Sequence, residues 1–158
     1  MALIIGDTAP EFSLYDSDRT LVHLSDYRGQ NVLLLFFPFA FTSTCTQQLC
    51  GTRDDLTTFQ DLDTKVFGIS ADSLHALARY KEELGLNFTL LSDFNKETIR
   101  AYDAVYETYK YGMKGVPKRA AFLIDAMGKI RYAEVLEDAG KIPDYDAIKN
   151  AIRTLQPN

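Results

Sequence analysis

Hydrophobic residues in this chain form one continuous block at Val32–Phe37, and the pattern changes on both sides of it. The block is too short to cross a bilayer, and Gly29 and Pro38 bound it. A short apolar run of this kind is typical of a strand that is buried on both faces in a parallel sheet. Pro38 has no N–H to donate, so strand pairing is expected to stop there.

Alternation and helical periodicity predict the remaining elements. The clearest amphipathic helix is Asp72–Leu84, which Gly85 is expected to end. The other expected helices are 44–58, 95–102 and 145–155. The other expected strands are 10–14, 20–24, 64–70, 88–91, 119–125 and 129–135, the last two forming a hairpin, and 103–118 is expected to be a loop. This order predicts one α/β domain over residues 1–158, with an antiparallel hairpin at one edge of its sheet.

The charge and composition exclude several classes of function. The formal net charge is -5 and basic residues are scattered, which argues against binding to nucleic acid. The start of the chain, Met1–Asp7, lacks the pattern of a signal peptide, and no run approaches the ~18 apolar residues of a membrane helix. We therefore expect a soluble cytoplasmic protein without a membrane partner.

No motif for a cofactor is present. The sequence contains no phosphate loop, no dinucleotide fingerprint and no HExxH, and its two cysteines and two distant histidines are a poor set of zinc ligands. We therefore expect neither a cofactor nor a metal.

The two cysteines, Cys45 and Cys50, carry the candidate chemistry. The run Thr44–Gln47 has the spacing of a capping box, which predicts that Cys45 lies in the first turn of a helix. The unpaired amides and the dipole of a helix start favour a thiolate. The dipole supplies only about 1 kcal/mol, so a cation from elsewhere in the chain is needed as well. The alternative for a lone cysteine is a small buried hydrophobic residue.

The spacing of Pro38, Thr42 and Cys45 resembles the PxxxTxxC active-site motif of the peroxiredoxins, which are thiol peroxidases on a thioredoxin fold. The resemblance covers nearly the whole chain, because three further segments match in the same order. These segments are Gly6–Phe12, Leu24–Gly29 and Arg119–Asp125. It implies a thioredoxin-like fold in which helices flank a central mixed sheet, with an N-terminal extension.

Two branches of the family are similar to different parts of the motif. The stretch Cys45–Asp54 resembles the bacterioferritin-comigratory (Q-type) branch, whereas Pro38–Thr42 is more similar to the one-cysteine alkyl hydroperoxide reductase E branch. One departure is Gln48, which stands where many relatives have a glutamate that hydrogen-bonds inside the site. We therefore expect a weaker role for this position.

The resemblance implies a role for each residue of the motif. Cys45 would be the peroxidatic thiolate, which reduces hydrogen peroxide or an organic hydroperoxide and becomes a sulfenic acid. Thr42 would orient the peroxide, and Pro38 would shield the sulfur from water. Arg119 would supply the missing cation; its alternative is a surface charge at the edge of a strand.

Cys50 would resolve the sulfenic acid as an intramolecular disulfide, which thioredoxin or a similar thiol donor would reduce. On an intact helix, residues i and i+5 lie roughly 8.5 Å apart, beyond the ~7 Å limit for a disulfide. The helix would therefore have to unwind locally in each turnover, as Q-type relatives are thought to do. The alternative is a structural Cys50, with an external thiol that resolves Cys45.

Other hypotheses remain at this point. A thioredoxin-type oxidoreductase would favour CxxC, whereas this spacing is CxxxxC. A Cys–His hydrolase would need His23 or His75 beside Cys45. No cysteine lies near the C-terminus, which argues against resolution across a dimer, and both a monomer and a homodimer remain open.

Overall fold

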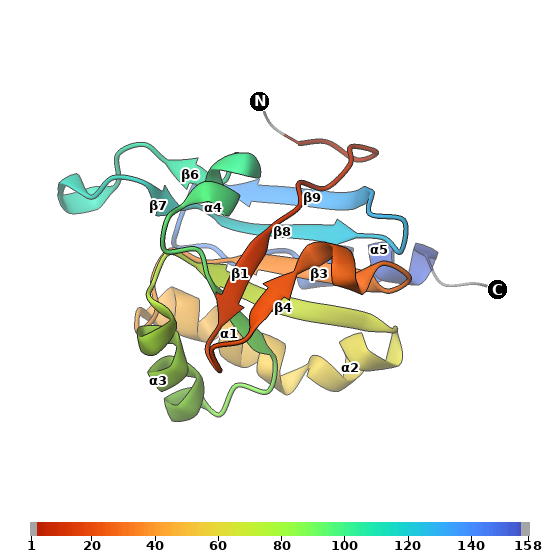
Figure 1. Cartoon of the computed structure of the whole chain (residues 1–158), viewed down its shortest axis with the longest axis horizontal. Coiled ribbons are helices and arrows are strands. Elements are labelled where there is room, and N and C mark those ends of the chain that lie inside the picture. The colour runs from red at the N-terminus through yellow and green to blue at the C-terminus, as the bar shows by residue number, and fades with distance from the viewer. Residues whose placement is uncertain (1–2, 156–158) are drawn as a thin grey trace.

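The computed structural model describes residues 3–155, and its centre is a mixed sheet of seven strands (Figure 1). Strand β3 (Asn31–Phe36) lies inside the sheet, where it pairs in parallel with β4 (Thr64–Ser70) and antiparallel with β8 (Arg119–Ile124). The next strand, β5 (Thr89–Ser92), continues the sheet in parallel with β4. The α/β prediction is confirmed, although β3 has one antiparallel neighbour.

Antiparallel pairs form both edges of the sheet. At one edge, β9 (Ile130–Leu136) completes the expected hairpin with β8. At the other edge, β1 (Ser13–Asp16) pairs with β5 and with β2 (Leu21–His23), so the N-terminal extension belongs to the sheet. The strand order is β2-β1-β5-β4-β3-β8-β9.

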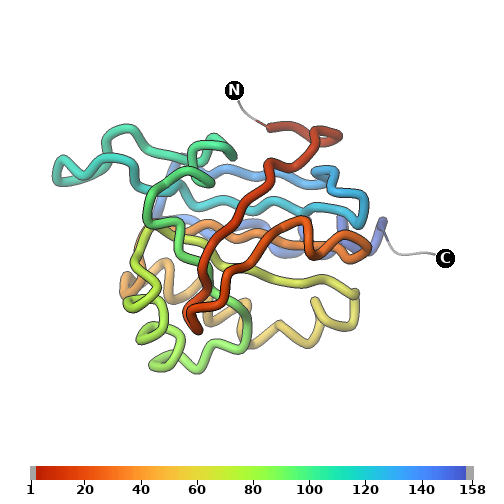
Figure 2. Tube along the Cα trace, viewed as in Figure 1, coloured from red at the N-terminus to blue at the C-terminus, as the bar shows by residue number. Residues whose placement is uncertain are grey.

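Helices cover the sheet unevenly. The helices are α1 (Ser43–Asp54), α2 (Leu56–Asp61), α3 (Leu74–Leu84), α4 (Glu97–Ala101) and α5 (Tyr145–Leu155). Residues of α1, α2, α3 and α5 pack in the core on one face, whereas α4 and the N-terminal segment pack in the core on the other (Figure 2). None of the helices in 3–155 combines the length and the apolar character needed to cross a membrane.

Alternation along β3 divides the hydrophobic core in two. Leu34 and Phe36 face the core under the N-terminal segment, and Leu33 and Leu35 face the core under the long helices. All four side chains are fully buried. The strand predicted from the apolar block is therefore buried on both faces, because each face of the sheet is covered.

Several local predictions were wrong, among them the strand expected over 10–14, which lies at Ser13–Asp16. The single helix expected over 44–58 ends at Asp54, and a separate helix begins at Leu56. Asp55 lies at the junction, where its carboxylate accepts a hydrogen bond from Thr58 and pairs with Lys149, and such local bonds compete with the helical backbone. The loop expected over 103–118 contains a short hairpin of β6 (Val105–Tyr106) and β7 (Val116–Pro117), with a 3-10 turn at Lys110–Gly112.

Gly68 in β4 allows its neighbours to pack closely. A Cβ atom added there would lie 2.8 Å from Cδ2 of Leu90 and 3.3 Å from Cε2 of Phe88. Both side chains belong to the core under the long helices.

We predict that Gly68→Ala lowers the free energy of unfolding by about 1–3 kcal/mol, because the added methyl group overpacks this core. Urea unfolding of the two proteins measures the change. The control is Gly51→Ala in α1, where a Cβ meets nothing within 4 Å and the expected effect is a small stabilisation. An unchanged unfolding midpoint for Gly68→Ala would contradict the close packing.

Candidate active site

A tight loop connects the end of β3 to the start of α1. Thr42 is the N-cap residue, and its hydroxyl donates to the carbonyl of Phe39 at 3.1 Å instead of capping the helix. The capping box predicted from Thr44 was wrong, because α1 begins at Ser43 and Thr44 is already helical. Cys45 nevertheless lies in the first turn, as predicted, where the amides of a helix start lack helical partners.

The loop holds an unusual backbone conformation at Phe41, whose φ of 68° is disfavoured for a bulky residue. Two contacts hold the loop. The carboxylate of Asp72 accepts the N–H of Ala40 at 2.9 Å, and the Phe41 ring packs on Tyr80 with 4.9 Å between centroids. The conformation at the start of α1 is thus fixed by residues of the neighbouring β4–α3 segment.

Cys45 lines a pocket of about 150 Å³ at the start of α1. The residue is 1% exposed, and its sulfur accepts a hydrogen bond from Nη1 of Arg119 at 3.2 Å. Pro38 and Thr42 line the same pocket. The structure therefore brings together four of the five residues that the sequence proposed for the site.

Arg119 reaches the pocket through the register of the sheet. It is the first residue of β8, and the antiparallel pairing of Ala120 with Phe36 places it where β3 ends. Its side chain is 1% exposed, so it is not the surface charge of the alternative interpretation.

The guanidinium of Arg119 donates to three acceptors. Nη1 donates to Cys45 Sγ and, at 2.7 Å, to Oε1 of Gln48, while Nη2 donates to the carbonyl of Ala139 at 2.9 Å. Nε is buried without a hydrogen bond. Of these three acceptors only the sulfur can carry a full negative charge, and a buried cation is costly without one. The sulfur of Cys45 is therefore the one of these three acceptors whose charge could balance that of the guanidinium.

Gln48 contributes more to the pocket than the sequence predicted. The residue is fully buried, and it holds the guanidinium beside the sulfur through the 2.7 Å bond. The signal was available, because Gln48 follows Cys45 by three residues and residues i and i+3 share one face of a helix.

Cys50 lies apart from this pocket. It is partly buried in the same unbroken helix as Cys45, and both cysteines are free. The five-residue separation therefore applies to an intact helix, as the sequence argument assumed.

Neither histidine lies in the pocket. His23 is on the edge strand β2, where Nδ1 lies 2.6 Å from the hydroxyl of Ser13, and His75 is exposed on α3. The structure thus offers no base for a Cys–His hydrolase in this pocket. Within residues 3–155, no three His, Cys, Asp or Glu side chains gather as metal ligands.

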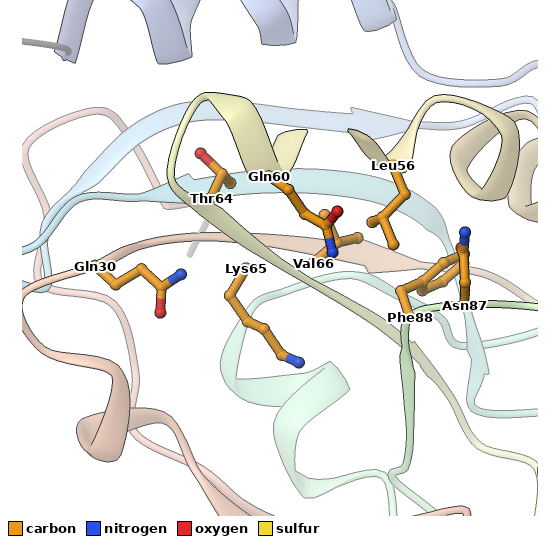
Figure 3. Close-up of a pocket in the computed structure, with 8 residues that line it drawn as sticks. All are labelled: Gln30, Leu56, Gln60, Thr64, Lys65, Val66, Asn87 and Phe88. Carbon is orange, nitrogen blue, oxygen red and sulfur yellow. The ribbon is translucent and has the colours of Figure 1, made fainter. Parts of the chain in front are cut away.

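A larger cavity of about 360 Å³ lies at the start of β4. Figure 3 shows its lining, in which Lys65 points away from Gln60 and Leu56 rather than converging with them. Its lining contains no cysteine. The cysteine that the sequence proposed as the nucleophile lies instead in the smaller pocket.

Comparisons with known proteins agree with this geometry. The family model described as "AhpC/TSA family" matches residues 5–133. The chain is 39% identical over 150 residues to "Peroxiredoxin Bcp" of Escherichia coli (strain K12), covering 94% of each. It is 36% identical over 156 residues to "Alkyl hydroperoxide reductase E" of Mycobacterium bovis, covering 97% of this chain and 98% of the relative.

A solved structure is also similar. The crystal structure of peroxidoxin BcpB from Mycobacterium tuberculosis superimposes with a TM-score of 0.84 at 27% identity. The match covers 97% of this chain and 98% of that one.

The contacts of Arg119 predict the reactivity of Cys45. In a Cys50→Ser background, Arg119→Ala should slow alkylation of Cys45 by iodoacetamide at pH 7 by about tenfold or more, because the thiolate loses its neighbouring cation. The ratio of the alkylation rates at pH 7 and pH 9 distinguishes a smaller thiolate fraction from reduced access of iodoacetamide to the sulfur. Lys118→Ala is the control, since Lys118 pairs with Glu137 instead. Equal alkylation rates in the two variants would contradict the role of Arg119.

Proposed function

Because the chain belongs to the AhpC/TSA family and is a thiol-dependent peroxidase like its relatives named peroxiredoxin, we propose that Cys45 is the thiol that attacks the peroxide. The observation that carries this assignment is the guanidinium of Arg119 at 3.2 Å from Cys45 Sγ, inside a pocket at a helix start. The family and the thioredoxin-like fold that the sequence predicted are confirmed by the relatives and by the likeness to BcpB.

In the proposed reaction, the thiolate of Cys45 attacks one oxygen of the peroxide and the O–O bond breaks. The sulfur becomes a sulfenic acid, and the second oxygen leaves as water or an alcohol after it takes a proton. Fixed donors aimed at the leaving oxygen would stabilise the charge that develops there. The guanidinium of Arg119 and the amides at the start of α1 are such donors.

Thr42 and Pro38 would position the peroxide. The Thr42 hydroxyl gives its proton to the carbonyl of Phe39, so its oxygen is left as an acceptor for a peroxide O–H. Pro38 is buried in the wall of the pocket and keeps water from the sulfur on that side.

The surroundings of the pocket favour organic hydroperoxides as substrates in addition to hydrogen peroxide. Pro38 and Phe39 line both the Cys45 pocket and a neighbouring cavity of about 290 Å³. Met113 and Val116 add apolar surface to that cavity. An alkyl group on the peroxide would find apolar contacts there.

We assign the resolving role to Cys50. Its thiol would attack the sulfenic acid of Cys45, release water and form a disulfide, after α1 has unwound locally. Thioredoxin or a similar dithiol would then reduce the disulfide. Both cysteines lie on one chain, so the cycle runs equally in a monomer and in a homodimer.

One observation favours a second candidate. In the structure α1 is continuous from Ser43 to Asp54, with Cys50 inside it. A protein in which this helix never opens would be a one-cysteine peroxidase, and an external thiol would resolve Cys45.

Mass spectrometry with thiol counting tests the assignment. One equivalent of hydrogen peroxide should convert the wild type to a disulfide, with two thiols lost and a mass lower by about two hydrogens. Cys50→Ser should stop at a sulfenic acid that dimedone traps, and Cys45→Ser should lose all peroxide reduction. The intramolecular disulfide is measured in both variants, and neither should form it because each lacks one of the two cysteines.

Two outcomes separate the candidates. Dimedone trapping in the wild type, without a disulfide, would overturn the role of Cys50 and support the one-cysteine cycle. Full activity of Cys45→Ser would overturn the proposed reaction itself.

Gly51→Ala tests the unwinding step. Alanine stabilises a helix interior relative to glycine, and the added Cβ meets nothing within 4 Å. We therefore expect disulfide formation to slow by about threefold while the first oxidation by peroxide keeps its rate. Stopped-flow tyrosine fluorescence follows the two phases. A resolving rate that is unchanged or higher would count against the unwinding of α1.

A further inference from the structure

The C-terminal helix α5 contacts the part of α1 that contains Cys50. The hydroxyl of Tyr145 in α5 lies 3.0 Å from Oγ1 of Thr52 in α1. The same hydroxyl lies 3.4 Å from the backbone carbonyl of Gln48, and Thr52 Oγ1 lies 3.0 Å from that carbonyl. Three oxygens from two helices therefore meet beside the stretch that contains Cys50.

Two hydroxyl protons serve these three contacts, so only two of them are hydrogen bonds at any moment. The two shorter contacts form a chain, in which Tyr145 donates to Thr52 and Thr52 donates to the carbonyl of Gln48. Burial raises the pKa of Tyr145 to about 12, so the hydroxyl keeps its proton throughout the neutral range.

The chain of hydrogen bonds spans the turn of α1 that contains Cys50. Gln48 and Thr52 are both fully buried, and Cys50 lies between them in the sequence. One turn further along α5, Lys149 pairs with Asp55 at the end of α1. Because Cys50 cannot approach Cys45 while this part of α1 is helical, the contacts with α5 oppose the opening.

We propose that Tyr145 is a positioning residue that sets the rate at which α1 opens, and thereby the fate of oxidised Cys45. This rests on the proposed resolving role of Cys50. The Tyr145–Thr52–Gln48 chain stabilises the closed helix, in which the sulfenic acid is kept beside Arg119. Breaking the chain frees the helix and speeds the attack of Cys50.

Two reactions compete for the sulfenic acid. In the opened helix, the thiol of Cys50 attacks the sulfur of Cys45, a disulfide forms and the oxygen leaves as water. In the closed helix, a second peroxide oxidises the sulfenic acid to a sulfinic acid and is itself reduced to water or an alcohol. Tyr145 thus determines the peroxide concentration at which the enzyme loses activity through over-oxidation.

Tyr145→Phe tests the proposal, because it removes the hydroxyl and keeps the ring. Disulfide formation should be about fivefold faster than in the wild type, and the peroxide concentration that half-inactivates the enzyme should rise by a similar factor. The first oxidation of Cys45 should keep its rate, since Tyr145 does not line the pocket.

Tyr102→Phe is the matched control. Its hydroxyl also donates to a backbone carbonyl, that of Pro10 at 2.7 Å, but Tyr102 belongs to the core on the other face of the sheet. This variant loses a comparable hydrogen bond and should keep the resolving rate of the wild type. Equal resolving rates in Tyr145→Phe and Tyr102→Phe would overturn the proposal.

Thr52→Val removes the middle of the chain and provides a second test. If Tyr145 acts through Thr52, the double variant should resolve no faster than the faster single variant. Fully additive increases would overturn the chain of hydrogen bonds.

The wild type is measured first, so that the two failures are distinguishable. Absence of a disulfide in the wild type would refute the resolving role of Cys50 and this inference with it. If the wild type forms the disulfide and Tyr145→Phe forms it at the same rate, only this inference is refuted.

Discussion

The site depends on one buried cation. Arg119 lies at the start of β8, and its guanidinium is held by hydrogen bonds to Gln48 and to the carbonyl of Ala139. The guanidinium faces the sulfur of Cys45. A charge without solvent requires compensating partners, and the sulfur of Cys45 is one of the acceptors that this pocket offers. The contact between the guanidinium and the sulfur therefore depends on the start of α1, which carries Cys45.

Helix α1 serves two opposing requirements. The proposed attack of Cys45 on a peroxide would need the closed helix, because its first turn carries Cys45 and supplies free amides. The proposed resolution by Cys50 would need the same helix to open, because five residues of α-helix hold the two thiols beyond the reach of a disulfide. The contacts from Tyr145 and Lys149 in α5 stabilise the closed form, whereas Gly51 weakens it. In the proposed cycle, the balance between these contacts would set how long the oxidised sulfur stays in the pocket.

Elements whose pattern admits one arrangement were predicted well. The strand 64–70 and the helix 145–155 have the predicted bounds, because their apolar residues match a single periodicity. The helix start was predicted less well. The spacing of Thr44 and Gln47 fits a capping box, but α1 begins where the loop after β3 delivers the chain, and that loop is held by Asp72. Polar residues in an exposed first turn carry no signal strong enough to override this.

The sequence by itself determined that a cysteine follows a buried strand at the start of a helix, and its motif and flanking segments indicated the family. Both can be read along the chain, since they depend on the types and order of residues and not on which distant residues meet. Only the tertiary structure decided that Arg119 is buried against the sulfur, that Gln48 holds it there and that the Tyr145 hydroxyl contacts Thr52 and the carbonyl of Gln48 in α1. These contacts join residues 71 to 97 positions apart. They arise from the antiparallel register of β3 with β8 and from the packing of α5 on α1. Neither can be predicted from a local sequence pattern.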